Sequence, residues 1–162
     1  MRCNYSTIFF IFLFILVMSC FHYSFTGTPT PGINSIAIPI FEDRSSEYRL
    51  KEKLNESLVN KFLKDNSLKI TSIDKADGII NGVITRVLDK PSSLEKTERA
   101  RQFELHIYLD VTFKNKKTGK IIFQKSFDGF GIYSDLSERD KSIDEAVEKL
   151  ATDVLNNVIS GW

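Results

Sequence analysis

The sequence is poor in cysteine, histidine, tryptophan and proline. Its 162 residues include two cysteines, two histidines, one tryptophan and four prolines. No cysteine follows Cys20, so the chain beyond it forms no internal disulfide and depends on a buried apolar core for its stability. His22 and His106 stand apart, without the groups of cysteine and histidine that hold zinc. No metal site is expected.

Motifs of catalysis and nucleotide binding are also missing. The sequence contains no P-loop and no GxGxxG, GxSxG or HExxH pattern. We therefore expect a protein that is not an enzyme and that needs no cofactor. Neither sign of charge is in excess: 22 basic residues less Arg2 leaves 21 beyond residue 19, against 21 acidic residues. This balance argues against a nucleic-acid partner.

No apolar run is long enough to cross a bilayer. The longest, Ile8–Met18, has 11 residues, whereas a membrane-spanning helix needs about 20. Arg2 is the only charged residue before it. A basic residue followed by a short apolar run is typical of a signal peptide, so residues 1–19 are interpreted as one and excluded from the fold.

The apolar run ends in Val17-Met18-Ser19-Cys20, which resembles a bacterial lipobox. The resemblance implies that Cys20 is lipidated and anchors the processed chain to a membrane. Two or more acyl chains hold a protein firmly, at about 0.8 kcal/mol per buried CH2 group. A plain secretory signal cleaved nearby is the alternative. Residues 20–34, which glycine and proline interrupt, are interpreted as an extended tether between the lipid and the fold.

Hydrophobic periodicity predicts a strand over 35–41, followed by a helix over 47–65. The strand is β-branched and apolar, and Pro39 places it near a sheet edge or places the proline at the strand's end. The helix carries an apolar stripe, and Ser46 is its expected N-cap. The stripe consists of Leu50, Leu54, Leu58 and Phe62, widened by Val59 and Leu63.

Four further strands are predicted, over 68–71, 79–88, 102–113 and 120–132. The third alternates most clearly, with apolar residues at odd positions from Phe103 to Phe113 and polar ones between them. Residues 89–99 are expected to form a loop, and residues 115–119 a hairpin turn with Gly119 in a left-handed conformation.

A second helix is predicted over 142–160, with Ser142 and Glu145 as a capping box. The resulting order, β-α-β-β-β-β-α, indicates the α+β class. We expect residues 35–162 to form a single α+β domain. It would be a two-layer sandwich, with two helices packed on one face of a mostly antiparallel four- to five-stranded sheet.

Several segments together resemble the LPS-assembly lipoprotein family, LptE. The segment 33–45 contains Ser-Ile-Ala-Ile-Pro-Ile-Phe, which is similar to the family's first strand, and residues 76–84 resemble the start of a later one. Thr118-Gly119-Lys120 stands at the hairpin tip, and Trp162 closes the terminal helix. The resemblance implies a cell outer-membrane lipoprotein on the periplasmic side. It would plug an LptD-type outer-membrane β-barrel, assist the barrel's assembly and help deliver lipopolysaccharide to the outer leaflet.

Clustered cations identify candidate contacts for the phosphates of lipopolysaccharide. The first group lies at the predicted hairpin and the second before the long strand. The residues are Lys114, Lys116, Lys117 and Lys120, then Arg99 and Arg101. A solvated hairpin tip is the alternative. The polar side of strand 102–113 is expected to face either water or the polar lumen of a barrel.

A different function is open at this point. Outer-membrane lipoproteins that activate a peptidoglycan synthase, or that take part in a CsgG-like secretion assembly, have a strand similar to residues 36–41 ahead of a helix. A small periplasmic enzyme would require a polar constellation that the sequence does not display. The segment at 76–84 and the hairpin favour the LptE resemblance.

Overall fold

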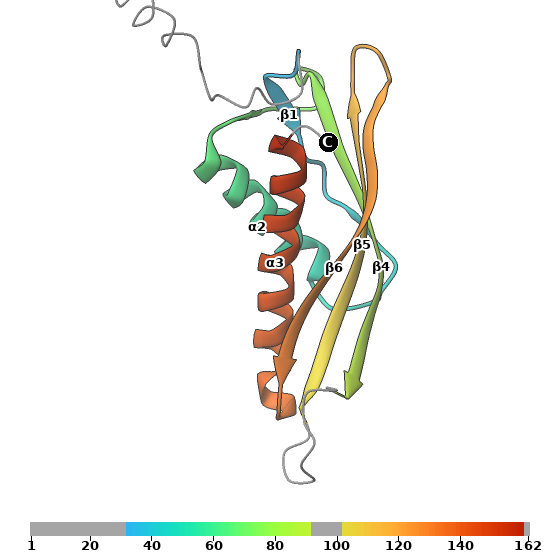
Figure 1. Ribbon diagram of the computed structural model, residues 1–162, viewed down its shortest axis with the longest axis vertical. Coiled ribbons are helices and arrows are strands. Elements are labelled where there is room, and N and C mark those ends of the chain that lie inside the picture. The colour runs from blue at the N-terminus through green and yellow to red at the C-terminus, as the bar shows by residue number, and fades with distance from the viewer. Residues whose placement is uncertain (1–31, 92–101, 161–162) are drawn as a thin grey trace, which may run out of the picture.

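The computed structural model describes residues 32–91 and 102–160 as a layer of helices beside a long twisted sheet (Figure 1). Residues 1–31, 92–101 and 161–162 lie outside the described parts. The strands are β1 (Ser35–Ala37), β2 (Glu42–Asp43), β3 (Lys69–Ile70), β4 (Gly78–Pro91), β5 (Phe103–Asn115) and β6 (Ile121–Tyr133). The helices are α2 (Leu50–Asp65), the short 3-10 helix η1 (Leu136–Glu138) and α3 (Arg139–Ile159).

The sheet is mixed and has six strands, in the order β3-β1-β4-β5-β6, with β2 also paired to β4. The α+β class and the two helices are confirmed. The expected mostly antiparallel sheet of four to five strands is only roughly right: β4, β5 and β6 are antiparallel, whereas β1 pairs in parallel with β3 and β4, and β2 with β4. Parallel strands need a crossover connection between them. Helix α2 provides it, because it lies in the sequence after β1 and β2 and before β3 and β4.

The predicted strand over 35–41 is shorter than expected: β1 covers only Ser35–Ala37, and residues 38–41 are not in a strand. β1 ends at Ala37, two residues before Pro39, which has no N–H to donate to a ladder. The chain then meets β4 again at β2, where Glu42 aligns with Val83. Pro39 was expected near a sheet edge or at the end of the strand. It lies instead in the segment that separates β1 from β2.

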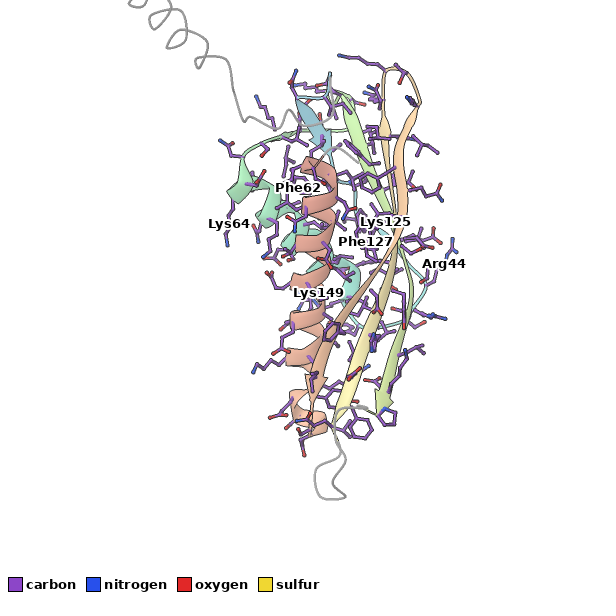
Figure 2. All side chains as sticks on the ribbon, viewed as in Figure 1. Arg44, Phe62, Lys64, Lys125, Phe127 and Lys149 are labelled. Atoms are coloured by element: carbon purple, nitrogen blue, oxygen red, sulfur yellow. The ribbon has the colours of Figure 1, made fainter. Side chains whose placement is uncertain are left out.

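The core lies between the sheet and the helices. β5 alternates as predicted, with Leu105, Ile107, Leu109, Val111 and Phe113 fully buried. α3 packs over β5 and β6, and α2 packs against α3. The buried side of α2 consists of Leu50, Leu54, Ser57, Leu58 and Phe62. Figure 2 shows Lys64 projecting from the outer side of this helix.

Helix α2 begins later than predicted and without the predicted cap. Ser46 and Arg49 both have positive φ angles, of 63° and 55°, so the chain turns twice before the helix begins at Leu50. Arg49 is the N-cap and makes no side-chain cap bond. Leu63, expected in the stripe, is exposed because it lies on the solvent side of the helix.

Helix α3 begins three residues earlier than predicted. Ser142 lies within its first turn, where its hydroxyl donates to the Arg139 carbonyl at 2.7 Å, so the capping-box prediction is wrong. The turn into the helix is η1, whose N-cap Asp135 accepts a bond from the Ser137 N–H at 2.8 Å. No helix in residues 32–91 and 102–160 is long and apolar enough to cross a membrane.

Candidate functional site

The helices leave one side of the sheet uncovered, and we call this side the open face (Figure 1). It is formed by side chains of β4, β5 and β6 that point away from the helices. Cross-strand register sets its rows. From the end near residue 91 inward, three of these rows are Lys90–Glu104–Ile132, Leu88–His106–Phe130 and Arg86–Tyr108–Asp128.

A cluster of aromatic rings occupies the second and third of these rows. The ring of His106 stacks on Tyr108, with centroids 6.0 Å apart, and lies 5.9 Å from Phe130. Its Nδ1 lies 2.9 Å from Asp128 Oδ1, and its Nε2 lies 3.3 Å from Glu104 Oε2. Contacts on both ring nitrogens fix the orientation of the imidazole, so this part of the face is an ordered surface.

Two cations lie against Tyr108 on the same face. The guanidinium of Arg86 lies 4.1 Å from the ring centroid, and Lys90 Nζ donates to the phenol oxygen at 3.0 Å. Such cation–π contacts contribute about 0.5–1 kcal/mol at exposed sites. They hold positive charge over a flat aromatic surface, which suits contact with carboxylate, carbonyl or aromatic groups.

The open face also exposes apolar side chains. Leu88, Phe130 and Ile132 belong to the two neighbouring rows and remain partly exposed, Phe130 by 43%. The prediction of a polar side for strand 102–113 therefore describes β5 but not the apolar side chains beside it. Apolar residues from β4 and β6 flank the polar groups of β5, and this mixture is typical of a protein-binding surface.

A β-bulge brings the β4 residues to this face. The register shifts between Ile84 and Arg86, and the hydroxyl of Thr85 donates to the Tyr108 carbonyl at 3.2 Å. Strict alternation from Ile80 and Ile84 would have turned Arg86 toward the core. Sequence reasoning missed Arg86, Leu88 and Lys90 for this reason, because no residue pattern here announces the bulge.

The predicted lysine hairpin lies at the far end of the same strands, and two of its four lysines are held by the neighbouring turn. Lys116 Nζ donates to the carbonyls of Ile73 and Asp74 at 2.7 and 2.6 Å. Lys117 Nζ lies 2.8 Å from Asp77 Oδ1. The hairpin is thus fixed to the chain that leads into β4, and Gly119 has the predicted left-handed conformation, with φ 71°.

Asp77 links this hairpin to the beginning of the fold. Its carboxylate accepts from Lys117, from the Ser35 hydroxyl at 2.8 Å and from the Asn34 N–H at 3.3 Å. The ammonium of Lys117, followed by the bonds from Ser35 and Asn34, holds the pKa of Asp77 well below its usual range.

The other predicted site residues divide into two groups. Lys114 and Lys120 form no ion pair within residues 32–91 and 102–160, so their ammonium groups are available to a ligand. Cys20, Arg99 and Arg101 lie outside the described residues. No group of three or more potential metal ligands occurs in the described parts of the chain.

The outer edge of β6 carries lysines beside aromatic rings. Lys125 Nζ lies 5.6 Å from the ring centroid of Phe127, and Lys149 Nζ, from α3, lies 5.6 Å from that of Phe130 (Figure 2). Lysine on an edge strand discourages pairing with a strand of another chain. We therefore regard the open face, and not this edge, as the candidate site for a protein partner.

Comparison with known proteins identifies structures with the same fold and the family to which the sequence belongs. Protein XCC0632 from Xanthomonas campestris superposes with a TM-score of 0.61 at 12% identity, covering 83% of this chain and 91% of that one. The hypothetical protein CT253 from Chlamydia trachomatis gives 0.60 at 10% identity, covering 80% and 97%. A minor lipoprotein from Acinetobacter baumannii gives 0.53 at 9% identity, covering 78% and 94%.

These identities are low, so the structural likenesses establish the fold alone. No curated protein matches the sequence. The sequence profile of the LptE family, described as lipopolysaccharide-assembly, matches residues 33–158. This match spans all the strands and helices described above, from just before β1 to the last turn of α3. The chain therefore belongs to the LptE lipopolysaccharide-assembly family.

Proposed function

We propose that this protein is an outer-membrane lipoprotein, anchored through lipid on Cys20 at the periplasmic side, that plugs an LptD-type β-barrel. In that position it assists assembly of the barrel and helps deliver lipopolysaccharide to the outer leaflet, without catalysing a reaction. The family match over residues 33–158 is the observation that carries this proposal. The lipobox-like Val17-Met18-Ser19-Cys20 supports the anchor.

The open face supports a barrel as the partner. The lumen of a large barrel is polar. Polar and charged groups on the surface of a plug can find hydrogen-bond partners there, so their burial is not costly. His106, Tyr108 and Asp128 supply such groups, and Phe130 and Leu88 add apolar contact area beside them. Activation of a peptidoglycan synthase, or a role in a CsgG-like assembly, has no comparable support from the family match.

Co-purification tests the partner. The lipidated protein, extracted from its native membrane in mild detergent, is expected to bring with it an outer-membrane β-barrel identifiable by mass spectrometry. Phe130→Glu is expected to lower barrel recovery at least about tenfold, because a carboxylate at the centre of an interface costs about 2 kcal/mol or more.

Leu136→Glu is the matched control. Leu136 is also an apolar residue and is 78% exposed, but it lies in η1, outside the open face. Recovery with this variant should equal that of the wild type. Recovery of a synthase in place of a barrel would overturn the proposed partner, and equal recovery with Phe130→Glu would overturn the role of the open face.

We also propose that the hairpin lysines contact lipopolysaccharide phosphates. Lys114 and Lys120 have no ion-pair partner among the described residues, whereas Lys116 and Lys117 hold the hairpin in place. Arg99 and Arg101 remain second candidates. A helper in lipopolysaccharide delivery has to meet a ligand with several phosphate groups, and ammonium groups without a partner of their own can meet them at least cost.

Replacing Lys114 and Lys120 with glutamine is expected to weaken lipopolysaccharide binding about 3- to 30-fold, since each exposed charge pair contributes up to about 1 kcal/mol. Binding of the purified protein in detergent measures this effect. Lys51→Gln with Lys141→Gln removes the same charge from the helices and should leave affinity unchanged. An unchanged affinity for the Lys114/Lys120 variant would contradict the assignment, and the same measurement on Arg99→Gln with Arg101→Gln would test the second candidates.

A further inference from the structure

Charge is unevenly distributed along the molecule. We define the basic end as residues 69–78 and 114–121, which contain six lysines, at 69, 75, 114, 116, 117 and 120, and two acids, Asp74 and Asp77. Its formal net charge is 6 − 2 = +4. The other described residues contain 12 basic and 17 acidic residues, a net of −5. A protein with this separation orients in an electric field, including that of a charged surface.

The chain enters the fold at the basic end. The carbonyl of Asn34 accepts from the Lys69 N–H at 3.0 Å, and its N–H donates to Asp77, which also holds Lys117. Figure 1 shows β1 and the β5–β6 hairpin at the same end of the molecule. Residues 21–31 separate Cys20 from Gly32, a span of at most about 40 Å when fully extended.

Two aliphatic side chains are exposed among these cations. Ile73 is 49% exposed beside Lys116, and Ile121 is 52% exposed opposite Lys114 in the ladder. A soluble phosphate would use the ammonium groups alone. Ammonium groups interleaved with exposed aliphatic side chains match a lipid surface, where head groups carry the phosphate and the layer beneath them accepts apolar groups.

We propose that the basic end docks on anionic phospholipid head groups of the membrane that holds the lipid anchor. The inference rests on the proposed lipidation of Cys20, which brings this end of the fold to the bilayer. Lysines near an anionic surface provide a second, salt-sensitive attachment.

A fluorophore at the hairpin tip tests the docking. Thr118→Cys gives a single free thiol, since Cys20 is acylated and Cys3 belongs to the signal peptide. The labelled lipidated protein is placed on vesicles of phosphatidylcholine alone, or with about 30% phosphatidylglycerol, that contain a head-group quencher. Quenching is expected to rise at least about threefold with phosphatidylglycerol at 0.1 M salt and to disappear at 0.5 M, where the Debye length falls from about 10 Å to less than half that value.

Variants identify the groups responsible. Lys114→Gln with Lys120→Gln, and separately Ile73→Ser with Ile121→Ser, are expected to reduce the phosphatidylglycerol-dependent quenching by at least half. Lys51→Gln with Lys141→Gln should not change it. Circular dichroism of each variant shows whether it is folded, and the salt dependence of the wild type tests the docking without any substitution at the lysines.

Three results would overturn the inference. Quenching that does not depend on phosphatidylglycerol means that the basic end does not dock. Quenching on phosphatidylcholine vesicles that contain lipopolysaccharide, without quenching on those that contain phosphatidylglycerol, assigns the lysines to lipopolysaccharide alone. A protein that leaves both kinds of vesicle has no lipid anchor, and this result overturns the anchor together with the docking, whereas the first two results leave the anchor intact.

Discussion

Replacing Gly131 with valine is expected to lower the free energy of unfolding by about 3 kcal/mol, at the upper end of the usual cost of overpacking a core. Gly131 lies in β6 beneath the first turns of α3. A Cβ atom placed there would come within 2.1 Å of the Ser142 carbonyl oxygen and 2.8 Å of the Ser142 Cα. Both atoms belong to the helix backbone, so no side-chain rotation relieves the clash and the helix itself must move.

Gly129, two residues earlier on the same side of β6, makes a similar approach to α3. Its added Cβ would lie 2.4 Å from the Ala146 carbonyl oxygen and 2.5 Å from Leu150 Cγ. Two glycines on one side of the strand thus let the helix approach its backbone closely. This contact closes the core over β5 and β6, so displacing α3 exposes apolar residues of both layers.

Thermal unfolding checks the prediction at Gly131. A loss of about 3 kcal/mol corresponds to a decrease in Tm of about 6–12 °C for a chain of this size. Gln124→Ala is the control, because Gln124 is an exposed residue of the same strand and should change Tm by less than about 2 °C. A Gly131→Val protein with the Tm of the wild type would show that α3 does not rest on β6 in this way.

Much of this fold follows from local pattern. The alternation in residues 102–113 identifies β5 and its buried side, because a strand half-covered by helices must alternate. The hairpin follows from Gly119, and the stripe from Leu50 to Phe62 identifies α2. For β5 and α2, a single periodicity that extends over ten or more residues outweighs the preference of any one residue.

The remaining features depend on contacts between distant segments. Residues 89–91 are polar and end in proline, yet they extend β4 because Asp89 aligns with Leu105 and Pro91 with Phe103. The bulge at Thr85 that turns Arg86 to the open face is set by pairing with β5. Local sequence does not encode partners 20 residues away, so the composition of the open face was accessible only from the structure.

The candidate site likewise combines features that local sequence predicts with features that depend on contacts between distant segments. Spacing alone identifies the cluster of lysines at 114–120 as a basic hairpin tip. It does not reveal that Lys116 and Lys117 are held by the turn at 73–77, since that contact joins residues about 40 positions apart. The structure therefore narrows a set of four equivalent lysines to two, Lys114 and Lys120, that have no ion-pair partner among the described residues.

Replacing Arg139 with glutamine is expected to destabilise the fold by about 2 kcal/mol. Arg139 is the first residue of α3, and its guanidinium binds Glu47 through two bonds of 3.1 and 3.0 Å. It also binds Asp89 near the end of β4 at 3.1 Å, and Asp89 accepts the Tyr133 hydroxyl at 3.0 Å. Burial, then the Asp89 carboxylate, raises the pKa of Tyr133.

This network joins the segment before α2 to β4, β6 and α3. Removing one member of a buried ion pair costs about 3–5 kcal/mol. The Arg139 side chain keeps 25% of its exposure, and water around it reduces that cost. The bidentate geometry nevertheless keeps the cost of removing Arg139 above the cost of losing an ordinary surface ion pair.

A double-mutant cycle separates this network from a general loss of packing. If Glu47 is the main partner, Arg139→Gln should cost about 1 kcal/mol less in a Glu47→Gln background than in the wild type, because the carboxylate left unpaired is no longer there. Denaturant unfolding measures each corner of the cycle. Lys141→Gln is the charge-matched control, since Lys141 is 80% exposed and only 3.8 Å from its partner Glu145. Equal costs in the two backgrounds would mean that Arg139 stabilises the fold by its aliphatic stem and Asp89 alone, and that the segment before α2 is held by other contacts.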